Sequence, residues 1–209
     1  MVFVGGAIPS PNRGGGEFGG RVPSNDELPT EYRAQTGRIT TEKSIPQLKT
    51  FLEAGGSIVT IGSSANLAYQ LKLPVTNALT ENVNGQERPL PGDKFYIPGS
   101  VLQVTYDTTQ PANWGMPAVG DVMFDSSPAF KVDPNANNQG IKALATYTTD
   151  KPLRSGWAWG QKYLKGSMAA FVAPYGAGKL YVFGPEITFR AQAHGTFKLL
   201  FNQLYGHAK

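Results

Sequence analysis

The sequence contains no cysteine among its 209 residues. That absence excludes disulfides, thiolate metal sites and a cysteine nucleophile. Histidine is scarce too, since only His194 and His207 occur and neither falls in an H-x-x-E or H-E-x-x-H spacing. No zinc site and no other cofactor is therefore expected in this chain.

Charge clusters and long apolar runs are also missing. The 19 Lys and Arg residues are scattered from Arg13 to Lys209, so nucleic acid is not an expected partner. No stretch approaches the roughly 18 apolar residues of a membrane span, and no signal peptide is recognisable, so no membrane contact is expected either. The length fits one domain over residues 1–209. Because apolar Val2 to Val4 follow Met1 directly, we expect an N-terminally truncated fold.

Glycine and proline, by contrast, are abundant, with 25 and 16 residues. They predict a flexible loop over about residues 7–38. Within it, Gly14, Gly16 and Gly19 satisfy G-x-G-x-x-G, but they follow prolines and open no helix. A pyrophosphate site needs a helix N-terminus at that point, so the motif is interpreted as surface loop.

Periodicity elsewhere predicts alternating helices and strands. Helices are expected at about 41–54, 64–71 and 196–205, and strands at 2–4, 57–61, 101–106, 121–124, 141–147, 168–173 and 180–183. Residues 72–99 are interpreted as turns, and the last two strands as a hairpin. Phe197, Leu200, Phe201 and Leu204 give the last helix one apolar face. This order predicts an α/β sheet with an antiparallel C-terminal extension.

A near match to the nucleophile elbow G-x-S-x-G follows the strand at 57–61, with Ser64 at its centre. A serine hydroxyl is inert without a base, and His194 is the candidate base. The alternative is structural: Ser63 or Ser64 caps the next helix, and His194 is a hydrogen-bonded structural residue. His207, near the C-terminus, is expected to be solvated.

Aromatic residues gather between positions 157 and 163. Trp157, Trp159 and Tyr163, beside Arg154 and Gln161, are suited to stacking on a sugar or peptide ring. Protein cores and subunit contacts use the same residue types, so a ligand site and a packed cluster both stay open.

Four phrases together resemble a known family. They are IPQLKTFLEAGG at 45–56, FYIPGS at 95–100, SGWAWG at 155–160 and FRAQAHGTFK at 189–198. They resemble the C-terminal portion of secreted bacterial zinc carboxypeptidases of the carboxypeptidase A type. The resemblance implies a flavodoxin-like, class I glutamine-amidotransferase-like domain with helices on both faces of its sheet. It further implies an upstream peptidase domain that carries the zinc, and a periplasmic or extracellular location.

The same resemblance implies that catalysis is lost in this domain. Active class I amidotransferases use a Cys at the elbow with a His and a Glu after a late strand, and here those positions match Ser64, Gly184 and Glu186. Without an imidazole this set cannot run acyl transfer. The leading hypothesis is therefore a non-catalytic accessory domain that supports or docks the peptidase. Its rivals are a serine hydrolase using Ser64 and His194, and a carbohydrate- or peptide-binding module using the aromatic residues, with Arg190 as a further ligand-binding candidate.

Overall fold

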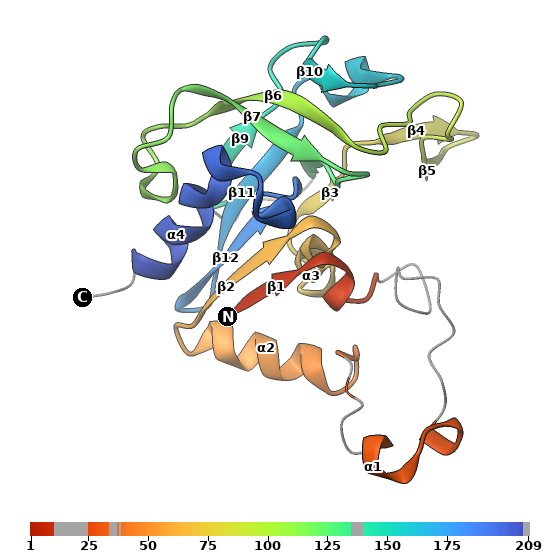
Figure 1. Ribbon diagram of the computed structural model, residues 1–209, viewed down its shortest axis with the longest axis vertical. Helices are drawn as coiled ribbons and strands as arrows, with labels where there is room; N and C mark the ends of the chain where they lie inside the picture. The colour runs from red at the N-terminus through yellow and green to blue at the C-terminus, as the bar shows by residue number, and fades with distance from the viewer. Residues whose placement is uncertain (11–24, 34–36, 38, 135–139, 207–209) are drawn as a thin grey trace.

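The computed structural model describes residues 1–10, 25–33, 37, 39–134 and 140–206 (Figure 1). The α-helices are α1 (Thr30–Arg33), α2 (Ser44–Glu53), α3 (Leu67–Gln70) and α4 (Phe197–Tyr205). The strands are β1 (Val2–Val4), β2 (Ser57–Ile61), β3 (Val75–Asn77), β4 (Thr80–Val83), β5 (Gln86–Pro89), β6 (Ser100–Tyr106), β7 (Val119–Phe124), β8 (Phe130–Val132), β9 (Lys142–Thr146), β10 (Leu153–Gly156), β11 (Met168–Tyr175) and β12 (Gly178–Phe183).

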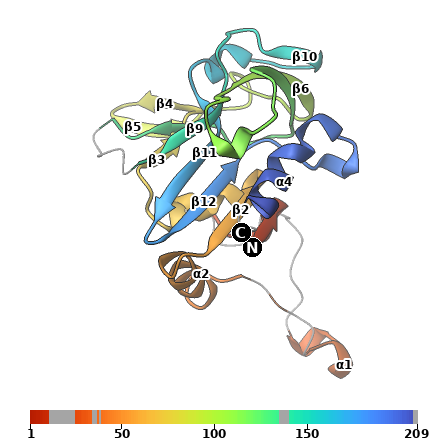
Figure 2. The same ribbon diagram turned by 90° about the vertical axis from the view of Figure 1, so that its left-hand side faces the viewer.

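One 10-stranded sheet organises the molecule. Seven of its strands follow one another in the order β1-β2-β12-β11-β9-β6-β10, and β3, β7 and β8 pair beside this path. The strands β1, β2 and β12 are parallel to one another, whereas β11, β9, β6 and β10 continue the sheet with antiparallel pairs. The antiparallel strands curl over the parallel ones, as Figure 2 shows from the side. The predicted α/β class with an antiparallel extension is confirmed.

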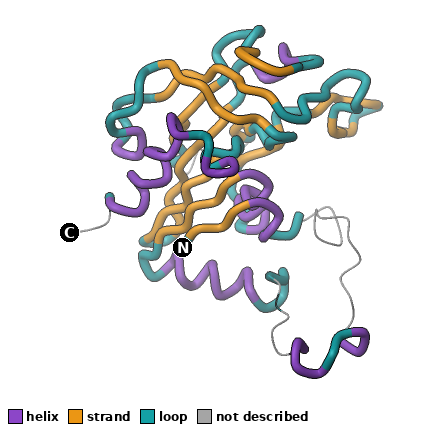
Figure 3. Tube along the Cα trace, viewed as in Figure 1, coloured by secondary structure: helices purple, strands orange, loops and turns teal. Residues whose placement is uncertain are grey.

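The parallel strands β2 and β12 are buried on both faces, and their side chains alternate between two cores. Ile58, Leu180 and Val182 point to the core that contains Leu48 and Leu52 of α2 and Leu67 of α3. Val59, Ile61, Tyr181 and Phe183 point to the other core, which contains Leu199 of α4. A period of two along each strand produces this division. Helices therefore cover both faces of the sheet, as predicted and as Figure 3 shows.

Several short strands depart from the sequence expectations. The region 72–99, predicted as turns, contains β3, β4 and β5, and β8 and β10 were not anticipated. Each of these strands has three or four residues. Periodicity is too weak to detect over so few positions. The last two strands do form the predicted hairpin.

The last helix, α4, is rotated about its own axis relative to the orientation that its apolar pattern predicts. Leu199 and Gln203 are buried, whereas Phe201 and Leu204 of the predicted apolar face are each 48% exposed. Amide hydrogen bonds determine this orientation. Asn202 Nδ2 donates to the carbonyl of Ala112 at 3.1 Å, and Gln203 Nε2 donates to the same oxygen at 2.9 Å. Phe201 and Leu204 are thus left at the surface, whereas Leu200 of the same predicted face packs against the core.

Some expectations fall outside the described residues, namely the motif at Gly14, Gly16 and Gly19 and the solvated His207. The predicted loop over 7–38 is described only in part, and there it includes a 3-10 helix at Asn25–Glu27 and the single turn α1. Among the helices described, none combines the length and the apolar character that a membrane crossing requires.

Candidate functional site

The predicted elbow is present at the carboxyl end of β2. The chain leaves Ile61, turns at Gly62 with φ of +63°, and enters a 3-10 helix at Gly62–Asn66 that leads into α3. A positive φ is unfavourable for residues with a Cβ, which explains the glycine at the turn. The sequence therefore predicts the strand–turn–helix geometry correctly.

Ser64 is fully buried inside this turn. Its Oγ donates a hydrogen bond of 2.5 Å to the carbonyl oxygen of Gly5, just after β1. The prediction that a serine caps the next helix is wrong, because the N-cap residues of the two helical segments are Ile61 and Asn66 and neither makes a side-chain cap bond. The hydroxyl instead ties the elbow to the neighbouring parallel strand.

Gly184, which the resemblance matched to a catalytic histidine, has no room for a side chain. A Cβ built there would overlap the carbonyl oxygen of Pro128 and would lie 3.0 Å from that of Ala169. The Gly184 amide also donates to Ala169 O at 2.9 Å, which holds the backbone in place. An imidazole at this position is incompatible with the packing.

Glu186 does lie at the elbow, with its carboxylate against Gly62. Burial raises the pKa of Glu186 above its ordinary value, and the negative charge of Asp125 raises it further. Such a shift often accompanies a functional carboxylate, but a general acid or base also needs a reacting partner.

His194 lies on the surface, before α4. Its Nε2 is 3.2 Å from the carbonyl oxygen of Ala191, and its ring centroid is 5.2 Å from that of Phe197. The contacts of Ser64 and His194 therefore involve different groups, and none joins the two. In the part of the chain that the structure describes, no three His, Asp or Glu side chains gather in a way that could hold a metal ion.

The aromatic residues predicted as ligand contacts are exposed. Trp157 and Trp159 are 53% and 54% exposed, and Tyr163 is 38% exposed. Tyr96, which was not anticipated, joins them at 50% exposure, with its ring 5.8 Å from that of Trp157 in an edge-on arrangement. We call Tyr96, Trp157, Trp159 and Tyr163 the aromatic cluster.

The segment that carries the two tryptophans is firmly held. Ser100 Oγ donates a hydrogen bond to the Trp157 carbonyl at 2.6 Å, and the Trp157 amide donates to Ser100 Oγ at 2.9 Å. Trp159 exchanges two backbone hydrogen bonds of 3.1 Å with Tyr96. The Trp159 indole N–H donates to the carbonyl of Asp93 at 2.6 Å.

Glycines at both ends make this arrangement possible. Gly156 has φ of +96° and packs on Ser100, and Gly160 has φ of +72° and packs on the Lys94 carbonyl. Side chains at either position would meet those atoms. Ala158, between the tryptophans, packs against the core, so both indoles project outward.

A hollow of about 480 Å³ lies beside the aromatic cluster. Its lining combines the rings of Trp159 and Tyr163 with polar side chains, namely Asp93, Lys94, Asp150, Lys151, Gln161 and Lys162. Its volume is within the range of small-molecule sites.

The other candidate ligand-binding residues lie elsewhere. Arg190 stacks on Phe189, with 5.1 Å between Cζ and the ring centroid, and Arg154 pairs with Asp121.

No protein-family model matches the chain, and no curated protein matches it. Solved structures of low similarity include a ThuA-like protein from Bacteroides uniformis, with 15% identity and a TM-score of 0.42; the match covers 79% of this chain and 64% of that one. Another is a ThuA-like protein from Parabacteroides merdae, with 12% identity and a TM-score of 0.45; the match covers 80% of this chain and 66% of that one. A β-galactosidase from Bacillus circulans sp. alkalophilus is also similar, with 12% identity and a TM-score of 0.48, although the match spans only 21% of that enzyme. These likenesses assign no activity.

The resemblance to a zinc carboxypeptidase domain is wrong. The similar structures are ThuA-like proteins and β-galactosidases, and no family or curated protein supports the link. Two of the phrases that carried it are structural: one forms α2 and its turn, and another forms the glycine-bounded segment of the aromatic cluster. Zinc, an upstream peptidase and secretion depended on that resemblance alone and are not carried further.

Proposed function

We propose that this chain is a non-catalytic α/β domain that binds carbohydrate through its aromatic cluster. The observation that carries the proposal is the exposure of Trp157 and Trp159 on a rigid segment beside a polar hollow. Contiguous exposed apolar patches rimmed by polar residues often mark ligand-binding or interaction sites. The contacts of Ser64 with Gly5 and of His194 with Ala191 support the non-catalytic half of the proposal.

A sugar fits this surface chemically. A pyranose ring presents C–H groups on its faces and hydroxyls around its edge, so its faces pack on indoles while its edge needs hydrogen-bond partners. The hollow supplies such partners in Asp93, Asp150 and Gln161 around the aromatic rings. Lys94 pairs with Glu81 outside the lining, and the remaining Lys151 and Lys162 balance Asp93 and Asp150, which favours a neutral ligand over a strongly charged one.

Preorganisation adds to affinity here. The hydrogen bonds of Ser100 to Trp157 and of the Trp159 indole to Asp93 fix the two rings before any ligand arrives. A ligand therefore loses little free energy in ordering the site.

The elbow offers no competing chemistry in its present geometry. The hydroxyl of Ser64 is buried and bonded to Gly5 O, so a substrate carbonyl has no access to it. A serine nucleophile requires a base within hydrogen-bond reach. The rival hypothesis of a hydrolase with His194 gains no support, since that imidazole contacts Ala191 and Phe197 instead.

The test is a calorimetric titration with neutral pentasaccharides of the glucan, xylan, mannan and chitin series. We expect saturable binding to at least one series, and a loss of roughly tenfold or more in affinity for Trp159→Ala, because exposed tryptophans dominate such contacts. Trp114→Ala is the matched control, since Trp114 is exposed but lies on another loop. Failure of all four series to bind, or equal losses in both variants, would overturn the proposal.

A further inference from the structure

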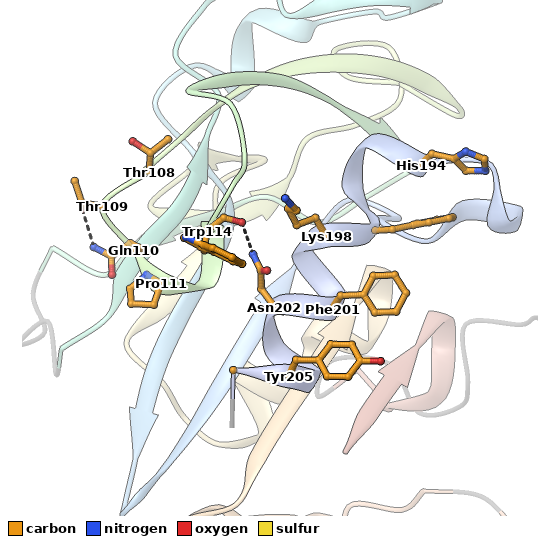
Figure 4. A pocket seen from close by; sticks show the side chains of 12 residues that line it. Thr108, Thr109, Gln110, Pro111, Trp114, His194, Lys198, Phe201, Asn202 and Tyr205 are labelled. Atoms are coloured by element: carbon orange, nitrogen blue, oxygen red, sulfur yellow. Dashed lines mark hydrogen bonds between the residues drawn. The ribbon is translucent and has the colours of Figure 1, made fainter. Parts of the chain in front are cut away.

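A second hollow lies between α4 and the segment that leads from β6 to β7 (Figure 4). Its volume is about 850 Å³, at the upper end of the range for small-molecule pockets. The residues that argue for a ligand are Trp114, Lys198, Phe201, Asn202 and Tyr205. We call this hollow the α4 groove.

Exposed rings form both walls of the α4 groove. Trp114 is 75% exposed on one side, and Phe201 and Tyr205 are 48% and 70% exposed on the other. The rings of Phe201 and Tyr205 stack with their centroids 6.1 Å apart. Together the three rings present apolar surfaces to both sides of a flat ligand.

The walls are fixed by hydrogen bonds. Asn202 Nδ2 donates to the carbonyls of Ala112 and Trp114, at 3.1 and 3.0 Å, and so joins the helix to the loop. Asn113 is buried and anchors the loop from behind, because its Nδ2 donates to Leu144 O at 2.7 Å. The groove is therefore formed before a ligand enters, which lowers the cost of binding.

The charge at the groove is positive. The Lys198 ammonium lies 5.8 Å from the centroid of the Trp114 ring, and no carboxylate of the described residues forms an ion pair with it. Among the residues that the structure describes, no Asp or Glu lines the groove. Asp107, at the start of the same loop, is occupied by hydrogen bonds from Thr109 and Gln110.

From this combination we infer that the α4 groove binds a small aromatic carboxylate. The ring of the ligand would lie between Trp114 and Phe201, and its carboxylate would accept a hydrogen bond from Lys198 Nζ. An anion is favoured because it supplies the counter-charge that Lys198 lacks, and a charge-assisted hydrogen bond is stronger than a neutral one. The inference is independent of carbohydrate binding.

The experiment compares two probes of equal shape, 2-naphthoate and the uncharged 2-naphthalenemethanol, by calorimetry on the full chain. We expect naphthoate to bind more tightly by roughly tenfold, because only it bonds to a charged donor. Lys198→Met should remove that difference and leave the alcohol unaffected. Trp114→Ala should weaken both probes.

Lys165→Met is the control, since Lys165 is exposed and lines neither hollow. It should change neither affinity. Equal binding of the two probes, no saturable binding of naphthoate, or an unchanged preference in Lys198→Met would overturn the inference. So would a self-association that Trp114→Ala abolishes and naphthoate does not displace, because the groove would then belong to a second copy of the chain. Circular dichroism confirms the fold of each variant, and Lys198, being exposed, is expected to tolerate replacement.

Discussion

Replacement of Gly184 by alanine tests whether packing excludes a side chain at this position. The added Cβ would overlap the carbonyl oxygen of Pro128 and approach that of Ala169 to 3.0 Å. Both contacts are backbone atoms, which cannot swing away as a flexible side chain can. The strand end must therefore shift, and its hydrogen bond to Ala169 must lengthen.

Overpacking of this kind costs about 1–3 kcal/mol. For a domain of this size each kcal/mol lowers the melting temperature by roughly 2–4 °C, so Gly184→Ala should melt about 2–12 °C below the natural chain. Urea denaturation followed by circular dichroism measures the free energy of unfolding. Gly195→Ala is the matched control, since a Cβ there meets no atom within 4 Å, and it should be neutral or slightly stabilising.

A Gly184→Ala variant as stable as the natural chain would refute the reasoning. It would mean that the strand end accommodates a side chain, and that a histidine at this position is not excluded by sterics. A Gly184→His variant that is as stable as the natural chain and that hydrolyses an activated ester would reopen a catalytic role for the elbow.

Three further predictions concern polar groups that are buried or half-buried. Ser64→Ala should lower the free energy of unfolding by about 1 kcal/mol in urea titrations, because the Gly5 carbonyl loses its donor; no change would contradict the structural role given to the hydroxyl. Glu186→Gln should stabilise the protein at pH 7–8 but not below the ordinary carboxyl pKa of 4.5, since a raised pKa in the folded state makes stability fall as pH rises through it. Thermal melts across pH 4–8 measure this, and a constant difference between the two proteins would argue against it. Tyr147→Phe should be neutral or stabilising by up to about 1 kcal/mol, because the buried hydroxyl has no hydrogen-bond partner among the described residues; a marked loss of stability would reveal one.

The fold class could be predicted because its signals are local. Alternating apolar residues from Ser57 to Ile61 and the glycine after them are enough to specify a buried strand and its turn. The rotation of α4 could not be predicted in this way. It depends on Asn202 and Gln203 reaching Ala112, about 90 positions away in the sequence.

In the candidate sites too, the residue types can be recognised in the sequence, whereas their exposure and contacts depend on residues far away in the chain. The Trp157 and Trp159 pair is visible in the sequence, but its exposure depends on Ser100, 57 residues earlier, and on a backbone bridge to Tyr96. Nothing local marks Trp114 and Lys198 as neighbours. Ser64 is visible as an elbow, whereas its burial against Gly5 arises from the pairing of β1 with β2.

The three tryptophans allow the central claim to be tested in one spectrum, since each contributes one indole N–H signal to a ¹⁵N-labelled protein. Titration with the pentasaccharide that binds best should shift the signals of Trp157 and Trp159 and leave that of Trp114 in place. Shifts confined to Trp114, or three unmoved signals at saturating sugar, would contradict a carbohydrate site at the aromatic cluster.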